Sequence, residues 1–389
     1  MMPRKTRLPD WFGCLSRVAT PRNDQTTRRR LPAEQDEDGW RFAFLNPFEL
    51  DFLKILESKA LRRLADKTQV ITRTDTETIS FDKTLHIRNR LTHTFDVVGL
   101  AGTMASALGL NIPLVRAGAL GHDLGHLPLG HTSEFFFQEQ GLPVRHENFG
   151  VYLAQFIERR VPGGLNLTIS TLKIINRHSR GRGNLNLGQE LSPEERLVLY
   201  ADKMAYLSAD PTDIFVKFRR MLNQDSSLNP LANQLDGKWP LIRDLLQSFL
   251  PNSAPPNQRE LQRCWVNALG EESADRGCVS FENSPTAQLF ARLRSEMMDI
   301  YQLVDFRHFA GNEPLTRAYR LLEKLGSDQG VNPVILFALL GDRELFRITE
   351  LPPEAKCIPK DLLQKISLAD ILPFLARTPL PPIEPWLDW

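Results

Sequence analysis

The sequence GHDLGHLPLGHTSE, from Gly121 to Glu134, decides the fold. It holds three of the eight histidines of the chain, together with one aspartate and one glutamate. The apolar run from Pro113 to Leu120 predicts a helix that begins at the proline. Gly125, Pro128 and Gly130 then interrupt helical periodicity. The His-Asp pair should therefore close a buried helix, and the two later histidines should follow on a loop that folds back over it.

The adjacent residues His122 and Asp123 offer an imidazole and a carboxylate, which suit a divalent cation of intermediate hardness. Two residues cannot hold a metal alone, so other helices must supply further ligands. One of these helices is predicted from about Arg90 to Leu108, and another begins at Ser192-Pro193-Glu194-Glu195, which has the pattern of a capping box. Each candidate could be an ordinary polar residue of its helix, but together they favour one metal site made by His93, His122, Asp123 and Asp202.

The order H…HD…D, with its flanking residues, resembles the HD superfamily of metal phosphohydrolases. Further motifs make the chain similar to the deoxynucleoside triphosphate triphosphohydrolase (dGTPase-like) family over about residues 45–215, and more broadly over 285–325. These motifs are Ser58 to Val70, Arg88 to His93, His122 to Glu134, His146-Glu147-Asn148, Gly164 to Thr168 and Asp202 to Tyr206. The resemblance implies hydrolysis of a dNTP to a deoxynucleoside and inorganic triphosphate, which lowers dNTP pools.

The composition is that of a globular protein with one large domain or two modest ones, because 42% of 389 residues are hydrophobic. The net charge of +1 gives no global field that would attract nucleic acid or a membrane. We expect no transmembrane helix, since no apolar run is long enough to span a membrane. We also expect no secretory signal, since no apolar run follows the charged N-terminus. Four widely spaced cysteines indicate reduced thiols and a cytoplasmic location.

The fold is predicted to be predominantly α-helical, an HD-domain helical fold with an additional C-terminal helical region. The sequence contains no P-loop, no GxGxxG motif and no nucleophile elbow. We expect a flexible N-terminal arm that is first basic and then acidic, and that could instead contact another subunit or single-stranded nucleic acid. The expected segments are 1–40 for this arm, 41–221 for the catalytic core, 222–349 for helices that complete the body, and 350–389 for an irregular Pro-rich tail.

A cation bound by two imidazoles and two carboxylates keeps positions for water and a phosphate oxygen, so it can polarise a phosphoryl group. This mixed donor set suits manganese, iron, magnesium or cobalt better than structural zinc. Arg90 precedes His93 by three residues on the same helical face, and Lys203 follows Asp202. The alternative for both cationic residues is pairing with a structural carboxylate. The resemblance implies that the phosphates are contacted by Arg90, Lys203, His126 and His146.

His131 and Glu134 are three residues apart, so a turn or a helix start can bring them together. A carboxylate beside an imidazole fixes its tautomer and favours the protonated form, which suits a general acid. The resemblance assigns this role to His131, with Glu134 as its support, and His126 completes the predicted catalytic group. The alternative is that Glu134 only caps the helix in which Phe135-Phe136-Phe137 packs inward.

Tyr206 and Asp210 follow Asp202 by four and eight residues, on one helical face. A tyrosine ring can pack under a deoxyribose and leave no room for a 2′-hydroxyl, while Asp210 can accept a hydrogen bond from the 3′-hydroxyl. The resemblance implies that Gln69 also contacts the 3′-hydroxyl. Each of these residues also has an ordinary core or surface interpretation. Leu129 and Ala209-Asp210 depart from the family pattern, which leaves the base preference and any allosteric nucleotide site open.

Other functions remain in competition with the dNTP triphosphohydrolase. One is a different HD phosphohydrolase, such as a nucleotidase or phosphodiesterase, and another is a nucleotide-binding or nucleic-acid-binding regulator with a vestigial site. The family commonly forms homo-oligomers, so we expect one, with a nucleotide as a candidate activator. His178 matches a His-Ser of the family, and we interpret it as structural.

Overall fold

The computed structural model describes residues 8–72, 87–160, 163–179, 191–223, 226–250, 257–305 and 311–383. Over these ranges the chain is built from helices, which confirms the predicted α-helical fold. Thr68 and Asn89 form one isolated antiparallel bridge in the described part of the chain. Residues 69–82 are rich in Thr, Val and Ile, which predicts a short strand pair or an extended loop. This segment lies mostly outside the described residues, because 73–86 are not among them.

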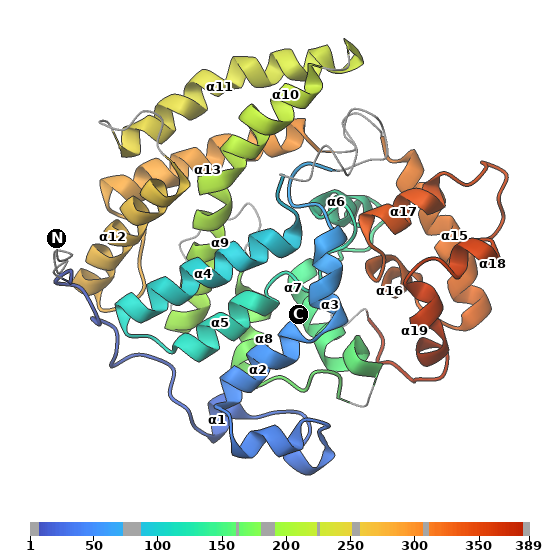
Figure 1. Cartoon of the computed structure of the whole chain (residues 1–389), viewed down its shortest axis with the longest axis horizontal. Helices are drawn as coiled ribbons and strands as arrows, with labels where there is room; N and C mark the ends of the chain where they lie inside the picture. The colour runs from blue at the N-terminus through green and yellow to red at the C-terminus, as the bar shows by residue number, and fades with distance from the viewer. Residues whose placement is uncertain are drawn as a thin grey trace, which may run out of the picture.

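Five helices form the centre of the molecule, and they carry the predicted metal ligands or pack directly against the helices that do (Figure 1). Helices α4 and α5 pack on each other, α9 crosses behind them, and α2 and α8 flank α5. The bounds are α2 (Pro47–Leu56), α4 (Arg90–Leu108), α5 (Ile112–Gly121), α8 (Ile169–Arg177) and α9 (Pro193–Thr212).

Local sequence explains where these central helices start and stop. The Asn89 side chain accepts a hydrogen bond from the Thr92 amide in a capping box, and Gly109 ends α4 in a left-handed conformation with φ 78°. Ser192 caps α9 by accepting from the Glu195 amide. The Glu195 carboxylate lies 3.4 Å from the Arg177 guanidinium, a contact with α8 that the expected capping box did not include.

Close backbone approach fixes the distance between α5 and α8. A Cβ atom on Gly118 would lie 2.4 Å from a side-chain carbon of Ile174, so only glycine fits there. A Cβ on Gly121 would likewise lie 2.7 Å from Ile175. The C-terminal end of α5, where the His-Asp pair begins, is therefore pressed directly onto α8.

A second group of helices follows the loop after α5 and packs with the C-terminal part of the chain. In Figure 1 these C-terminal helices, coloured orange to red, lie to the right of the central helices. The group consists of α6 (His131–Glu139), α7 (His146–Tyr152), α15 (Glu313–Gln329), α16 (Pro333–Ala338), α17 (Asp342–Thr349), α18 (Lys360–Leu363) and α19 (Leu368–Leu375). The expected irregular tail thus contains two helices, and α19 buries Ile371, Leu372 and Leu375.

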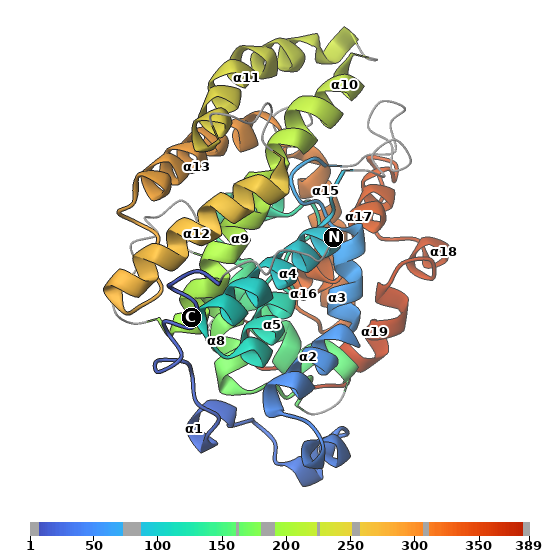
Figure 2. The same cartoon turned by 60° about the vertical axis from the view of Figure 1, so that its left-hand side comes forward.

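A third layer of helices packs against α9 and α4 and extends the molecule at the upper left of Figure 1. Figure 2 shows this layer from the side. It contains α10 (Arg219–Leu222), α11 (Asn229–Phe249), α12 (Gln258–Arg276) and α13 (Pro285–Leu303). None of the helices in the described part of the chain combines the length and the apolar character that crossing a membrane requires.

The N-terminal residues from 8 onward pack against the body, which corrects the expectation of a flexible arm over residues 1–40. Trp11 is buried against α12, where a Cβ on Gly270 would lie 2.4 Å from its ring. The short helix α1 (Asp24–Thr27) contacts α8. Arg29 reaches Asp51 on α2 at 2.5 Å. The basic part of the N-terminal segment is therefore held by a buried ion pair. Residues 1–7 of the chain lie outside the described part.

We predict that Asp51→Ala lowers the free energy of unfolding by about 3–5 kcal/mol, because it leaves a buried guanidinium without its partner. Asp51 is fully buried and also accepts hydrogen bonds from the Thr168 amide at 3.0 Å and the Thr171 hydroxyl at 2.7 Å. Urea titration followed by circular dichroism measures the change. The control is Asp370→Ala, since Asp370 is 74% exposed and pairs with Lys59 at 3.7 Å. That change should cost less than about 1 kcal/mol, and equal losses in the two variants would contradict the prediction.

Candidate active site

The predicted metal ligands come together where three helices meet. His93 lies in the first turn of α4, His122 and Asp123 follow α5, and Asp202 lies in the middle of α9. The shortest contact between them joins His93 Nε2 to Asp202 Oδ1 at 3.0 Å. His122 Nε2 lies 3.3 Å from Asp123 Oδ1 and 3.9 Å from Asp202 Oδ1. The sequence prediction that four distant residues share one point agrees with these distances.

The protonation of His122 makes this cluster suitable for a cation. Its Nδ1 donates a hydrogen bond to the Ala119 carbonyl at 2.7 Å, and burial lowers its pKa although Asp123 and Asp202 raise it. The lone pair is therefore on Nε2, which is buried and has no hydrogen-bond partner among the described residues. A lone pair that faces two carboxylates is unfavourable unless a cation lies between them. This donor set fits a divalent metal.

The two predicted cationic residues both pair with carboxylates of this cluster. Arg90 Nη1 lies 3.1 Å from Asp123 Oδ2, and its other nitrogens donate to the Thr68 and Gln69 carbonyls at 2.9 and 3.3 Å. Lys203 Nζ donates to Asp202 Oδ2 at 2.7 Å. The alternative of pairing with a structural carboxylate is therefore present, while both side chains also line the cavity described below.

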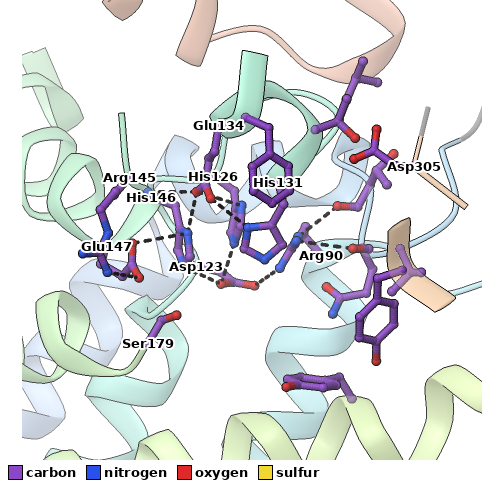
Figure 3. A pocket seen from close by; sticks show the side chains of 18 of the residues that line it. Arg90, Asp123, His126, His131, Glu134, Arg145, His146, Glu147, Ser179 and Asp305 are labelled. Atoms are coloured by element: carbon purple, nitrogen blue, oxygen red, sulfur yellow. Dashed lines mark hydrogen bonds and ion pairs between the residues drawn. The ribbon is translucent and has the colours of Figure 1, made fainter. Parts of the chain in front are cut away.

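The loop histidines gather around Glu134 (Figure 3). Glu134 Oε2 lies 2.8 Å from His131 Nδ1, and Oε1 lies 2.6 Å from His146 Nδ1. His126 stacks on the His146 ring with centroids 3.7 Å apart, and its Nε2 lies 3.1 Å from Asp123 Oδ1. Neither ring nitrogen of His126 has a hydrogen-bond partner within the described residues. Glu134 thus orients two histidines, which exceeds the capping role considered for it.

The charge of His146 follows from its neighbours. Burial by itself lowers the pKa of His146, but the carboxylates of Glu147 and Glu134 outweigh it and raise the pKa to about 9. Burial raises the pKa of Glu134, but His146 and His131 hold it well below its usual range. At neutral pH this corner of the site therefore contains an imidazolium beside a carboxylate, an arrangement that favours anionic ligands next to His146.

A cavity of about 460 Å³ opens over these residues. All the predicted site residues line it except His93 and His122, which touch its acidic residues Asp123 and Asp202. Sequence reasoning missed four lining residues from the end of α13 and just beyond it, and local patterns give no signal for them. These are Met298, Tyr301, Gln302 and Asp305.

One end of the cavity carries the residues expected to hold a sugar. The Tyr206 ring meets the Tyr301 ring edge-on with centroids 6.0 Å apart. Asp210 accepts from Tyr301 at 2.8 Å and from Arg88 at 2.5 Å, while burial raises its pKa to about 6. Gln69 Oε1 is buried and accepts no hydrogen bond from any described residue. Gln69 therefore offers an open acceptor, whereas both oxygens of Asp210 already have donors.

Two buried residues hold the loop in place: Asp342, which the sequence did not single out, and Lys67 of the motif from Ser58 to Val70. Asp342, the first residue of α17, accepts from the Thr68 hydroxyl at 2.6 Å and the Leu129 amide at 2.7 Å. Leu129 has φ 60°, an unfavourable value for leucine that this contact helps to hold. Lys67 Nζ donates to the carbonyls of His126 and Ala338. The second group of helices thus fixes the loop that carries His126 and leads to His131.

His178, interpreted from the sequence as structural, lies inside the site. Its Nδ1 contacts the Ile175 carbonyl at 2.8 Å, and its Nε2 lies 3.1 Å from His146 Nε2 and 3.9 Å from Asp123 Oδ1. Burial lowers the pKa of His178 to about 3, so the ring is neutral. The signal available in the sequence was its family match alone, because α8 shows no pattern that points His178 toward the HD loop.

Comparison with known proteins agrees with this geometry. A family model of the HD domain matches residues 90–207, which contain all four predicted metal ligands. Several bacteria have proteins named deoxyguanosinetriphosphate triphosphohydrolase-like protein that are similar to this chain. The relative from Desulfatibacillum aliphaticivorans is 40% identical over 171 residues, which are 43% of this chain and 46% of the relative. The relative from Clostridium tetani is 32% identical over 236 residues, covering 59% and 62%.

The match with Bartonella henselae is longer and weaker. That deoxyguanosinetriphosphate triphosphohydrolase-like protein is 26% identical over 364 residues, which are 84% of this chain and 86% of the relative. The chain thus spans less than two thirds of the length of the two relatives named before it. The HD match, the repeated relatives and the helical fold nevertheless agree with one another. The chain contains an HD domain over residues 90–207, and it is similar to the deoxyguanosinetriphosphate triphosphohydrolase-like proteins of these bacteria.

Proposed function

We propose that this protein is a metal-dependent phosphohydrolase that converts a dNTP to a deoxynucleoside and inorganic triphosphate. The observation that carries the proposal is the buried Nε2 of His122, which faces Asp123 and Asp202 at the floor of a cavity of about 460 Å³. One end of this cavity has imidazoles and cationic groups suited to phosphates, and the other has two tyrosine rings suited to a nucleoside.

The proposed ligands of the cation are His93, His122, Asp123 and Asp202. Manganese, magnesium, iron or cobalt suits this set, and when bound such an ion polarises a phosphoryl group and lowers the pKa of water. Arg90 and Lys203 hold the two ligand carboxylates in place and add positive charge at the cavity wall. In the proposal both also face phosphate oxygens, together with His126 and the imidazolium of His146.

His131 is the proposed general acid. It lines the cavity, its side chain is 51% exposed, and Glu134 accepts from its Nδ1 at 2.8 Å. Water attacks the α-phosphorus and loses a proton to solvent, the bond from phosphorus to the 5′-oxygen breaks, and His131 gives its proton to that oxygen. The products are then a neutral 5′-hydroxyl and intact triphosphate. Glu134 keeps the ring in the orientation that this transfer needs.

The proposed nucleoside end of the cavity favours a deoxyribose over a ribose. The Tyr206 ring lies on the same helix as Asp202, with Lys203 Nζ 5.9 Å from its centroid. In the proposal this ring occupies the space of a 2′-hydroxyl. The unpaired acceptor of Gln69 receives the 3′-hydroxyl. Asp210 supports this end through Tyr301 and Arg88.

Other family expectations stay predictions. They are assembly into a homo-oligomer, activation by a nucleotide, a cytoplasmic location, and the division of the chain at residues 40, 221 and 349. The contact of the N-terminal segment with single-stranded nucleic acid also stays a prediction, although Arg29 in that segment already pairs with Asp51.

We predict that Asp202→Ala binds one divalent cation per chain fewer than the wild type and has no activity, because the carboxylate bridging His93 and His122 is gone. Elemental analysis of protein saturated with Mn²⁺ and then desalted measures the loss. The control is Asp299→Ala, an exposed aspartate on α13, which should bind as much metal as the wild type. Unchanged metal content in Asp202→Ala would remove the proposed site.

The bond that breaks is tested by product analysis in ¹⁸O-water with Mn²⁺, Mg²⁺ or Co²⁺ and each of the four dNTPs. We expect deoxynucleoside and triphosphate, with the label in the triphosphate. His131→Ala should lower kcat by about 10²–10⁴-fold, the usual contribution of a general acid, and leave the metal content unchanged. Release of pyrophosphate with dNMP would instead indicate another HD phosphohydrolase.

Sugar discrimination is tested by comparing kcat/KM for each dNTP with that for the matching NTP. We expect the dNTP to be strongly preferred, because the Tyr206 ring would clash with a 2′-hydroxyl. Tyr206→Phe keeps the ring and should keep the preference, whereas Tyr206→Ala should reduce it by at least about tenfold. Similar values for dNTP and NTP in the wild type would refute this role of Tyr206.

A further inference from the structure

We infer that Asp342 is a positioning residue, which holds the proposed general acid His131 in place from the C-terminal helices. Asp342 is fully buried and is the first residue of α17. Its Oδ1 accepts from the Leu129 amide at 2.7 Å, and its Oδ2 accepts from the Thr68 hydroxyl at 2.6 Å. Leu129 precedes His131 by two residues. One carboxylate thus joins the start of α17 to the backbone that carries the acid.

The backbone just before His131 depends on a contact from outside. Leu129 and Gly130 both have φ 60°, a value that leucine adopts only at a cost in free energy. Helix α6 begins at His131, and its N-cap Gly130 has no side chain to accept from the first amides. Without Asp342, the amide of the buried Leu129 would lose its acceptor, and the strained backbone would be free to relax.

A shift at Leu129 would reach the imidazole because the intervening turn is braced. The Gly130 amide donates to the Leu127 carbonyl at 3.1 Å, and the Ser133 hydroxyl donates to the Pro128 carbonyl at 2.5 Å. Residues 127–133 should therefore move as one unit. Glu134 lies on the same helix and orients the ring, whereas Asp342 fixes the backbone from which the ring projects.

The other oxygen of Asp342 connects this unit to the proposed metal ligands. The Thr68 carbonyl accepts from Arg90 Nε at 2.9 Å, and Arg90 Nη1 lies 3.1 Å from Asp123 Oδ2. A Cβ on Gly130 would lie only 3.0 Å from the Thr68 carbonyl oxygen, so the turn and this segment are in close contact. The carboxylate of Asp342 therefore fixes His131 relative to the place where the proposed cation binds.

This inference deepens the proposed function and rests on it, because only in that proposal is His131 the general acid. The structural alternative is that Asp342 serves the start of α17, where a carboxylate is favourable, and the packing of the C-terminal helices. The two roles differ in their kinetics. A purely structural residue acts whether or not His131 is present, whereas a positioning residue acts through His131.

A double-mutant cycle on the full chain, with Mn²⁺ and the dNTP that the wild type hydrolyses fastest, tests the inference. Asp342→Ala should lower kcat by about 10²-fold, the usual cost of displacing a reacting group by about 1 Å, and leave the metal content unchanged. When His131→Ala is already present, adding Asp342→Ala should cause no further loss, because the acid that it positions is gone.

Two further variants separate positioning from stability. Asp342→Asn should recover most of kcat, since its oxygen can accept from the Leu129 amide and its nitrogen can donate to the Thr68 hydroxyl. The matched control is Glu344→Ala on the same helix. The Glu344 carboxylate accepts from the Gly341 amide at 2.9 Å and the Ser367 hydroxyl at 2.8 Å, both among the C-terminal helices. Its loss should lower stability but leave kcat of the folded protein unchanged.

The position of His131 is also measured without turnover, by NMR of the chain labelled with ¹³C in its histidine rings. The His131 signal is the one absent from His131→Ala. We expect it to shift in Asp342→Ala and to keep its position in Glu344→Ala. If the wild type releases no triphosphate, the proposed function fails, while this pattern of shifts still supports the positioning role of Asp342.

Three results would overturn the inference. They are a kcat of Asp342→Ala close to that of the wild type, an equal loss with and without His131, and a His131 signal that does not shift. Circular dichroism checks folding. If Asp342→Ala does not fold, Thr68→Val takes its place in the cycle, because it cuts the other contact of the carboxylate with a nearly isosteric change. A loss that persists in the absence of His131 would count against the inference there as well.

Discussion

The site depends on one electrostatic conflict, in which a buried imidazole lone pair faces two carboxylates. The only N–H of the neutral His122 ring donates to the Ala119 carbonyl, so Nε2 faces Asp123 and Asp202 as an acceptor among acceptors. In a buried place such a conflict costs free energy that only a positive charge at the centre removes. Arg90 and Lys203 approach from outside and neutralise the far oxygens, but they leave the near ones facing His122.

The helical scaffold keeps these groups together against their repulsion. Helix α5 leads into the His-Asp pair. Glycines along α5 let isoleucine side chains of α8 approach closely, and Gly125 in the following loop lets the backbone of α7 do so, at distances that a Cβ atom would not permit. The loop is then fixed from the opposite side by Asp342, which binds Thr68 and Leu129 at once. The second group of helices is thus part of the site, since it sets the position of the loop histidines.

Histidines around the cluster occupy different charge states because their partners differ. His146 has two carboxylates nearby and is cationic, while burial keeps His178, only 3.1 Å away, neutral. Glu134 holds His146 and the half-exposed His131 with its two oxygens. The starts of α6 and α7 therefore place the proposed anion-binding group and the proposed proton donor side by side, and one carboxylate fixes both positions.

The sequence by itself determined the helical fold and the starts of α4 and α9, because caps and helical spacing are local properties. The order H…HD…D also singled out the four residues that meet at the proposed cation site. Tertiary structure alone decided that Trp11 packs on α12, that α13 reaches the cavity, and that His178 lies against Asp123. Asp342 and Leu129 are 213 residues apart. Contacts at such separations arise from the packing of whole helices, and the periodicity of a single helix contains no information about which distant face it will meet.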